Sequence, residues 1–182
     1  MKWKVIDSEY LFQDPPWLSV RKDRCMLPNG KLMPAFYVNE YPEWVTGFAL
    51  TANGKVVLVK QYRHGIEEVC IETPGGVVDN GESPEAAVKR ELLEETGYSF
   101  STIEYLGKIC ANPSTANNFL HMYLLQGGEK TSDQQLDETE DVEVALYSID
   151  EIKTFLKNNS IRQSMHASCM FYALNKLGEM AY

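Results

Sequence analysis

The feature that most restricts the fold is the stretch of residues 76–98, where a glycine turn leads into a helix crowded with carboxylates. Residues 73–76 (TPGG) are a turn signal. Ser83 and Pro84 predict a helix start, because Ser caps the first turn and Pro lacks an N–H group that would have no partner there. Gly97 predicts the end of the helix, so a turn and a short capped helix stand at the centre of the chain.

This helix presents several glutamates on one face. Glu91, Glu94 and Glu95 fall within an arc of about 100°, because residues three and four apart share a helix face. Lys89 points away from Glu91, so Arg90 is the cation placed to offset part of their repulsion. Oxygen ligands without His or Cys on the same face suit a hard ion such as Mg²⁺ or Mn²⁺. The pattern predicts a divalent-cation site, and the ordinary alternative is a solvated helix face.

The spacing of these residues resembles a known family motif. The positions that match the Nudix box are Gly76, Glu82, Arg90, Glu91, Leu92, Glu94, Glu95 and Gly97. Tyr98 departs from the motif, because it is aromatic where a bulky aliphatic residue is usual. The resemblance to Nudix hydrolases extends over residues 45–177 and implies an α/β class fold, the Nudix α/β/α sandwich with a mixed central sheet.

Within the family, the chain looks most like the ADP-ribose pyrophosphatase branch. The similarity rests on residues 60–65 (KQYRHG), on residues 72–76 (ETPGG) and on basic residues that precede a turn at 28–30. This branch implies Mg²⁺-dependent hydrolysis of ADP-ribose to AMP and ribose 5-phosphate. Residues 112–118 (NPSTANN) depart from the Ser-Pro-Gly form of the better-characterised ADP-ribose hydrolases, and so the sugar moiety stays open.

Carried over onto this sequence, the resemblance implies a role for each candidate site residue. The metal ligands would be the Gly75 carbonyl, Glu91, Glu94, Glu95 and Glu140. The catalytic residues would be Glu138 as the base that takes a proton from the attacking water, Glu94, and Arg90 as the group that orients a carboxylate. The substrate-binding residues would be Arg63, Arg24, Phe36, Trp44 and Gly76.

Several alternatives remain open at these positions. Glu138 and Glu140 could exchange roles, and the acidic loop around them could be merely solvated. Arg63 could form an ordinary surface ion pair, and Arg90 could form a simple helix pair with Glu94. The same box would also serve a nucleoside triphosphate or dinucleoside polyphosphate hydrolase, or a non-catalytic ligand-sensing Nudix domain.

The rest of the chain reads as strands and two further helices. Short alternating runs in residues 2–41 predict an N-terminal antiparallel β-meander, with a two-residue hairpin turn at Asn29-Gly30. Strands are expected at 45–51, 55–61, 69–73, 102–110, 119–125 and 142–148, and helices at 149–158 and 161–177. The last helix has an apolar stripe that favours core packing, made of Ile161, Met165, Cys169 and Tyr172.

We expect two segments, residues 1–42 as a meander that dimerises the protein and residues 43–182 as the hydrolase domain. The meander is too short for a core of its own, yet it carries much aromatic surface, for which a second copy is the simplest cover. The aromatic residues are Trp3, Trp17, Phe36 and Tyr37, with Trp44 just beyond. The alternative is that they pack within their own chain.

Composition limits the partners and the compartment. A net charge of −9 argues against non-specific nucleic-acid binding, which needs a basic surface. The cysteines lie far apart without a Cys-x-x-Cys pair, which indicates thiols in a reducing compartment. The N-terminus has no apolar signal segment, and no run approaches the ~18 apolar residues of a membrane span. We therefore expect a cytoplasmic protein that contacts neither membrane nor nucleic acid.

Overall fold

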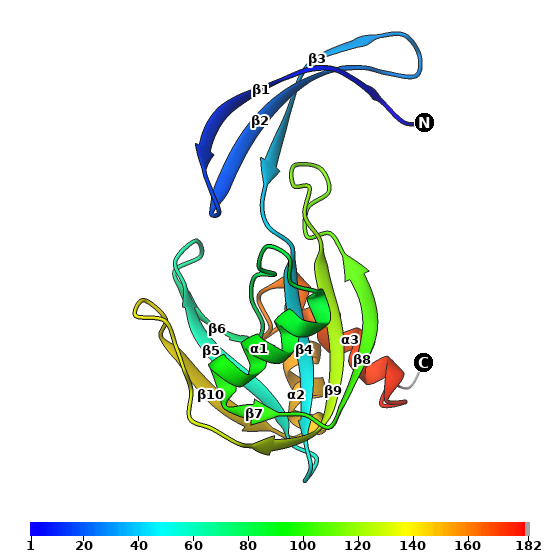
Figure 1. Ribbon diagram of the computed structural model, residues 1–182. Coiled ribbons are helices and arrows are strands. Elements are labelled where there is room, and N and C mark those ends of the chain that lie inside the picture. The colour runs from blue at the N-terminus through cyan, green and yellow to red at the C-terminus, as the bar shows by residue number, and fades with distance from the viewer. Residues whose placement is uncertain (181–182) are drawn as a thin grey trace. The chain divides into compact units, whose positions relative to one another are not determined.

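The computed structural model describes residues 1–180, and its contacts divide the chain into two compact units (Figure 1). The smaller unit contains residues 1–43 and 110–119. The larger unit contains residues 44–109 and the chain from residue 120 onward. Residues 110–119 thus belong with the N-terminal strands, although they are far from them in the sequence.

The smaller unit is built on an antiparallel sheet in the order β1-β2-β3, which is the predicted meander (Figure 1). Its strands are β1 (Lys4–Asp14), β2 (Leu18–Met26) and β3 (Leu32–Glu40). The turn between β2 and β3 corrects one prediction. The Leu27 N–H donates to the Lys31 carbonyl at 2.9 Å, so the turn holds three residues rather than two. Its last residue, Gly30, is left-handed with φ 78°.

The loop of residues 110–119 adds to the edge of this sheet. The Asn39 N–H of β3 donates to the Thr115 carbonyl at 2.6 Å, and Asn39 forms a parallel bridge with Ala116. The Asn118 side-chain amide donates to the Pro42 carbonyl at 3.0 Å. The asparagines that distinguish this loop therefore serve partly to attach it to the chain that follows β3.

The larger unit contains a seven-stranded sheet with the main order β10-β5-β4-β9-β7, while β6 pairs with β5 and β8 pairs with β9. Its strands are β4 (Trp44–Thr51), β5 (Val56–Arg63), β6 (Glu68–Glu72), β7 (Tyr98–Ser99), β8 (Thr102–Ile109), β9 (Leu120–Lys130) and β10 (Val142–Tyr147). The helices are α1 (Pro84–Thr96), α2 (Ile149–Lys157) and α3 (Ser164–Lys176). Because β4 and β9 are parallel and the other pairs antiparallel, the sheet is mixed, as predicted.

Helices cover both faces of this sheet and confirm the predicted α/β/α sandwich (Figure 1). Alternate residues of β4 enter two separate cores, because successive side chains of a strand point to opposite faces. Phe48 packs with Ile152 of α2 and Met170 of α3 in one core. Val45 packs with Leu92 of α1 in the other. The helix α1 thus lies alone on its face of the sheet.

The structure corrects the last helix. It begins at Ser164 rather than residue 161, and Tyr172, predicted in the apolar stripe, is 50% exposed. Cys169 is buried as predicted, and it shares the buried face with His166, Met170, Ala173 and Leu174. Tyr172 follows the buried Met170 by two residues, which places it on the opposite side of the helix. No helix within residues 1–180 has the length and apolar character needed to cross a membrane.

Candidate active site

Helix α1 carries the acidic side chains, and its ends are fixed as predicted. The Ser83 hydroxyl accepts the Ala86 N–H at 3.2 Å, and Pro84 occupies the first turn. Gly97 is left-handed with φ 74°, and its N–H donates to the Leu93 carbonyl at 2.9 Å. The apolar side of α1 packs on the sheet, and this orientation decides how deeply each glutamate is buried.

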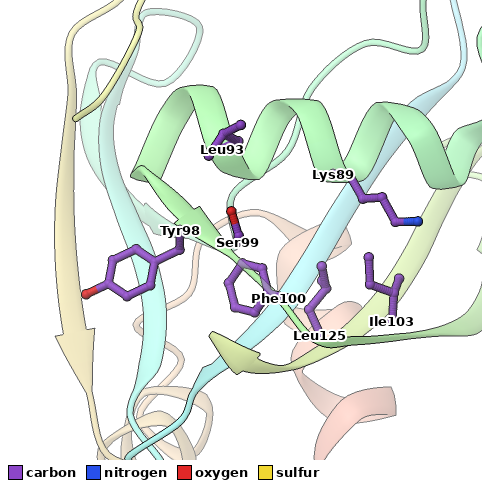
Figure 2. Close-up of a pocket in the computed structure, with 7 residues that line it drawn as sticks. All are labelled: Lys89, Leu93, Tyr98, Ser99, Phe100, Ile103 and Leu125. Atoms are coloured by element: carbon purple, nitrogen blue, oxygen red, sulfur yellow. The ribbon is translucent and has the colours of Figure 1, made fainter. Parts of the chain in front are cut away.

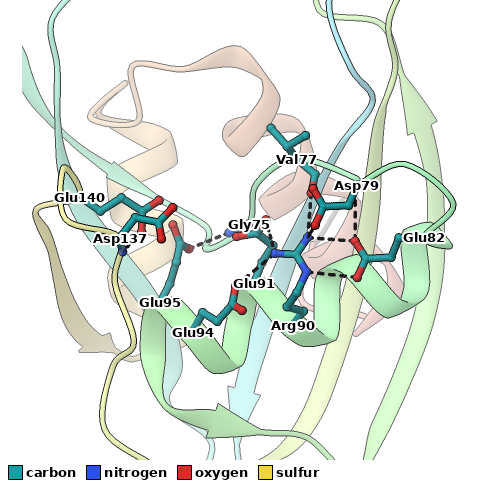
Figure 3. Close-up of polar contacts among 10 residues, drawn as sticks. All are labelled: Gly75, Val77, Asp79, Glu82, Arg90, Glu91, Glu94, Glu95, Asp137 and Glu140. Atoms are coloured by element: carbon teal, nitrogen blue, oxygen red, sulfur yellow. Dashed lines mark hydrogen bonds and ion pairs between the residues drawn. The ribbon is translucent and has the colours of Figure 1, made fainter. Parts of the chain in front are cut away.

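Glu95 is the most buried of the helix glutamates, with 6% of the residue exposed. Its Oε2 accepts the Gly75 N–H at 2.9 Å, which links the helix to the glycine turn (Figure 3). Burial raises the pKa of Glu95 to about 8, and the charges of Glu91 and Glu140 add to the rise. The Gly75 N–H and the charge of Arg63 oppose it only in part. Glu95 is therefore a carboxylate without enough positive charge around it.

The glycine turn lies close to the strand at Gly75 and to the Glu91 carboxylate of the helix at Gly76. A Cβ on Gly75 would lie 2.2 Å from the Val45 carbonyl oxygen, and the residue has φ 153°. A Cβ on Gly76 would lie 2.5 Å from the carboxyl carbon of Glu91. The Val45 N–H donates to the Gly76 carbonyl at 2.9 Å, which ties the turn to β4. The paired glycines bring backbone next to the acidic cluster.

Glu91 and Glu94 complete the face of the helix. The Glu91 carboxylate is mostly buried, whereas Glu94 is more open to solvent. Burial raises the pKa of Glu91, and repulsion from Glu94 and Glu140 adds to it, while Arg90 lowers it. Glu91 and Glu95 are thus neighbouring carboxyl groups that both have raised pKa values.

Arg90 holds this cluster in place. Its Nη1 donates to Glu91 Oε1 at 2.9 Å and to Glu94 Oε2 at 3.1 Å (Figure 3). Its Nε and Nη2 donate to the two oxygens of Glu82 at 3.1 and 2.9 Å, and Nη2 also donates to the Val77 carbonyl at 3.0 Å. The hydrogen bonds that Arg90 donates to Glu82 outweigh the effect of burial and raise the pKa of Arg90. Arg90 therefore joins the loop before α1 to the glutamates on it, so the orienting contact and the helix pair are both present.

The acidic loop is attached to the end of α1. The Gln134 side-chain amide donates to the Glu95 carbonyl at 2.7 Å and to the Val142 carbonyl at 3.0 Å. The Gln135 N–H donates to the Glu94 carbonyl at 2.8 Å. These bonds satisfy carbonyls that the last turn of a helix leaves without partners. Gln134 had no assigned role in the sequence analysis, because nothing in the local pattern shows which carbonyls it will meet.

Two carboxylates of this loop differ in their surroundings. Glu140 points toward Glu95, and its Oε2 accepts the Asp137 N–H at 3.1 Å (Figure 3). Its charge contributes to the raised pKa values of Glu91 and Glu95. Glu138 lies on the same loop and is exposed. The structure therefore brings Glu140 next to the helix glutamates, and the roles of Glu138 as base and Glu140 as metal ligand stay predictions.

The donor set of the cluster fits a hard divalent cation. Every candidate side-chain donor is a carboxylate, and Glu91 and Glu95 have raised pKa values that a nearby cation would lower. Within residues 1–180, no three His, Cys, Asp or Glu side chains are already gathered to hold an ion. Glu91 and Glu94 each use one carboxylate oxygen to accept a hydrogen bond from Arg90.

Arg63, a predicted substrate-binding residue, is partly exposed and forms an ion pair with the buried Glu72. Its Nε donates to both carboxylate oxygens of Glu72 at 3.0 and 3.1 Å. Only 1% of Glu72 is exposed, and the Nε2 of His166 lies 3.2 Å from it. Burial opposes ionisation, but the hydrogen bonds and charges of His166 and Arg63 outweigh it and lower the pKa of Glu72 to about 2. The roles of Glu72 and His166 were not predicted from the sequence, because nothing local in the chain links them to Arg63.

The other predicted substrate residues lie in different parts of the chain. Trp44 starts β4 and packs partly against the core of the larger unit. Phe36 belongs to the smaller unit, where its ring meets Trp3 edge-on at 5.7 Å between centroids. Arg24 of the smaller unit pairs with Asp7. The binding roles of Trp44, Phe36 and Arg24 stay predictions.

A small cavity of about 220 Å³ lies elsewhere on the larger unit, between α1 and the strands that follow it (Figure 2). Lys89 and Leu93 line it from the helix, on the side away from Glu91. Phe100, Ile103 and Leu125 supply most of its apolar wall. The cavity contains none of the predicted site residues, so it is separate from the acidic cluster.

Comparisons with known proteins agree with this arrangement. The family model described as the NUDIX domain matches residues 42–168, and the nucleoside diphosphate sugar hydrolase N-terminal domain matches residues 3–39. A methanol dehydrogenase activator from Bacillus methanolicus is 33% identical over 162 residues, which cover 88% of this chain and 86% of that protein. An ADP-ribose pyrophosphatase from Bacillus subtilis is 31% identical over 170 residues, which cover 93% and 91%.

A solved structure supports the fold. The crystal structure of an ADP compounds hydrolase is similar with a TM-score of 0.85 and 20% sequence identity, and the match covers 99% of this chain and 98% of that chain. The matched family domain spans the capped helix, the glycine turn and the carboxylates described above. The chain therefore belongs to the Nudix family of hydrolases.

Proposed function

We propose that the protein hydrolyses the pyrophosphate bond of a nucleoside diphosphate linked to a sugar. The observation that carries the proposal is the pair of crowded carboxylates, Glu91 and Glu95, held beside the Gly75 turn on a helix with the Nudix spacing. The match of residues 3–39 to the N-terminal domain of nucleoside diphosphate sugar hydrolases supports this substrate class. ADP-ribose is the main candidate, with AMP and ribose 5-phosphate as products, since a relative of this length is an ADP-ribose pyrophosphatase.

The proposed metal ligands are Glu91, Glu95, Glu94, Glu140 and the Gly75 carbonyl. A bound Mg²⁺, or Mn²⁺, would neutralise charge on the diphosphate and lower the pKa of a water molecule. Arg90 would keep Glu91 and Glu94 within reach of the ion, because it already holds both. Glu138 would accept the proton of the attacking water, and its exposed place on a loop fastened to α1 leaves it free to approach.

Substrate binding is proposed for Arg63, Arg24, Phe36, Trp44 and Gly76. Arg63 has the firmest support, because Glu72 holds two of its nitrogens and so fixes the plane of the guanidinium. A guanidinium held in this way is oriented to bind a phosphate or a ribose through its remaining N–H groups. Gly76 supports close approach of substrate to the backbone, because a side chain there would strike Glu91.

We also propose a homodimer in the cytoplasm. All of β1 is exposed, and the smaller unit leaves large apolar side chains in contact with solvent, among them Trp17, which is 74% exposed. A second copy of the chain would cover them. Light scattering at micromolar concentration should give twice the 20.7 kDa chain mass. A monomer with full activity would contradict the proposed homodimer.

A substrate panel tests the proposed reaction. The protein would be incubated with ADP-ribose, another nucleoside diphosphate sugar, a nucleoside triphosphate and a dinucleoside polyphosphate, each with Mg²⁺ and with a chelator. Production of AMP and ribose 5-phosphate from ADP-ribose, only with Mg²⁺, is the expected result. Faster turnover of the triphosphate or the dinucleoside polyphosphate would favour the alternative hydrolase activity. Binding of ADP-ribose without turnover of any substrate would contradict the proposal.

A further inference from the structure

We infer that His166 of α3 is a positioning residue for the Gly75 turn, and that it acts through the hydroxyl of Thr73. The inference rests on the proposed function, because the turn matters only if the acidic cluster beside it is the site of hydrolysis. His166 comes from the helix layer opposite α1, so it reaches the turn from the other side of the sheet.

The contacts of His166 are short and buried. Only 8% of the residue is exposed, its Nδ1 lies 2.8 Å from the Thr73 hydroxyl, and its Nε2 lies 3.2 Å from Glu72. The Thr73 hydroxyl lies 2.7 Å from that of Thr46 on β4. The Thr46 hydroxyl also lies 3.0 Å from the Pro74 carbonyl. A continuous polar path thus runs from α3 to the residue before Gly75.

The direction of these hydrogen bonds follows from the chemistry of the partners. Glu72 is an ionised carboxylate paired with Arg63 and only accepts hydrogen bonds, so Nε2 of His166 carries the hydrogen. The Thr46 hydroxyl donates its hydrogen to the Pro74 carbonyl, so it accepts from the Thr73 hydroxyl. The Thr73 oxygen then accepts from Nδ1 of His166, so both ring nitrogens of His166 carry a hydrogen. His166 therefore fixes the orientation of the Thr73 hydroxyl.

Thr73 in turn controls the position of the glycine turn. Its neighbour Pro74 accepts the Gly47 N–H of β4 at 3.0 Å, and the next residue, Gly75, donates to Glu95 at 2.9 Å. Gly75 has little room to shift, because the β4 backbone lies where its Cβ would be. A change at Thr73 would therefore be transmitted to the hydrogen bond that holds Glu95.

Two substitutions of His166 separate this role from a purely structural one. His166→Gln keeps an N–H donor near the position of Nε2 and loses the donor facing Thr73. His166→Asn keeps an amide near the position of Nδ1, whose N–H can donate to Thr73, and loses the donor facing Glu72. We expect the Gln variant to lose more activity and the Asn variant to lose more stability, because the Asn variant leaves the buried Glu72 with fewer donors.

Thr73→Val tests the same link without changing His166. We expect Thr73→Val and His166→Gln to lower kcat about tenfold with KM within about twofold, as for one lost buried hydrogen bond. Thr51→Val is the matched control, because it removes a buried hydroxyl at the far end of β4, where that hydroxyl accepts the Lys55 N–H at 2.9 Å. Thr51→Val should change stability and leave kcat unchanged.

A measurement without metal or substrate makes the test independent of turnover. Hydrogen exchange at the Gly75 amide should be about tenfold faster in Thr73→Val and in His166→Gln, and unchanged in Thr51→Val. Equal effects of Thr73→Val and Thr51→Val on exchange, or a larger kcat loss in His166→Asn than in His166→Gln, would overturn the inference. If the unmodified protein hydrolyses no substrate, the proposed function fails, while the exchange data still decide whether His166 holds the turn.

Discussion

Glu72 and Glu95 are two buried carboxylates of the larger unit with opposite environments. Glu72, 1% exposed, receives hydrogen bonds from Arg63 and lies against His166, and its pKa falls to about 2. Glu95, 6% exposed, receives one backbone N–H and faces Glu91 and Glu140, and its pKa rises to about 8. Burial alone therefore does not mark a functional carboxylate. Arg63 and His166 compensate the negative charge of Glu72 within the protein. Glu95 has no such compensation and would need an added cation to ionise readily.

The first prediction concerns Glu138, a carboxylate that is buried neither like Glu72 nor like Glu95. Glu138 is exposed, so its contribution should lie in proton transfer and not in burial. Glu138→Gln should lower kcat by roughly 10²–10⁴, with little change in KM or in Mg²⁺ affinity, as expected when a general base is lost. Steady-state kinetics with Glu140→Gln as the comparison would check this. If only Glu140→Gln shows the loss, Glu140 is the base and the loop is still catalytic.

The second prediction tests Glu72, the buried carboxylate whose charge is compensated. Glu72→Gln leaves Arg63 and His166 without their anion, and should lower the free energy of unfolding by about 3 kcal/mol, because an uncompensated buried partner remains. Arg63 is partly exposed and is solvated after the change, which keeps the loss toward the low end. Urea unfolding measures it. A loss below about 1 kcal/mol would show that Glu72 is not a structural anchor.

The third prediction tests Glu95, the buried carboxylate whose charge is not compensated. Glu95→Gln replaces a carboxyl group whose ionised form is disfavoured by burial and by the charges of Glu91 and Glu140, so the metal-free protein should be at least as stable as the unmodified protein. Turnover should fall more than tenfold, about 1.4 kcal/mol of barrier, because a proposed metal ligand is lost. Urea unfolding with a chelator and kinetics at saturating Mg²⁺ measure the two effects. A variant that keeps more than about a tenth of kcat would remove Glu95 from the ligand set.

The fourth prediction sharpens the comparison through pH. The pKa of Glu95 rises from 4.5 to about 8 on folding, so its stabilising contribution is complete below pH 4.5 and is lost as pH rises through 8. The pKa of Glu72 falls from 4.5 to about 2, so its contribution is present above pH 4.5 and is lost as pH falls toward 2.

Metal-free protein should therefore be most stable near pH 4.5 to 5, and lose up to about 1 kcal/mol per pH unit toward pH 8. Urea unfolding at several pH values with a chelator gives this slope. In Glu95→Gln the decline should be shallower, and saturating Mg²⁺ should reduce it in the unmodified protein. An equal slope in the variant would assign the pH dependence to other groups.

The sequence predicted the parts of the site that are local in the chain. Ser83, Gly97 and the face shared by Glu91 and Glu95 follow from helix capping and from the helical period, which need no knowledge of the fold. The mixed sheet followed from the family resemblance. The three-residue turn at Gly30 was missed, because a hairpin pattern alone does not fix the hydrogen bonds that close it.

The partners of Glu72 could not be predicted in the same way. Arg63, Glu72 and His166 come from two strands and from a helix near the end of the chain, and only the fold brings them together. No periodicity links residues so far apart. Gln134 was missed for a similar reason, because its amide is shared between the end of α1 and the start of β10.

The double contact of Gln134 has a consequence for how this enzyme could diversify. The bonds of Gln134 and Gln135 fix one end of the acidic loop to the helix, and Gln134 also bonds to Val142, where the loop ends and β10 begins. Residues 136–141 thus form a cassette between two anchored points. Selection, or a protein engineer, could exchange the cassette to change the base or the substrate, while the helix, the glycine turn and the sheet are inherited unchanged.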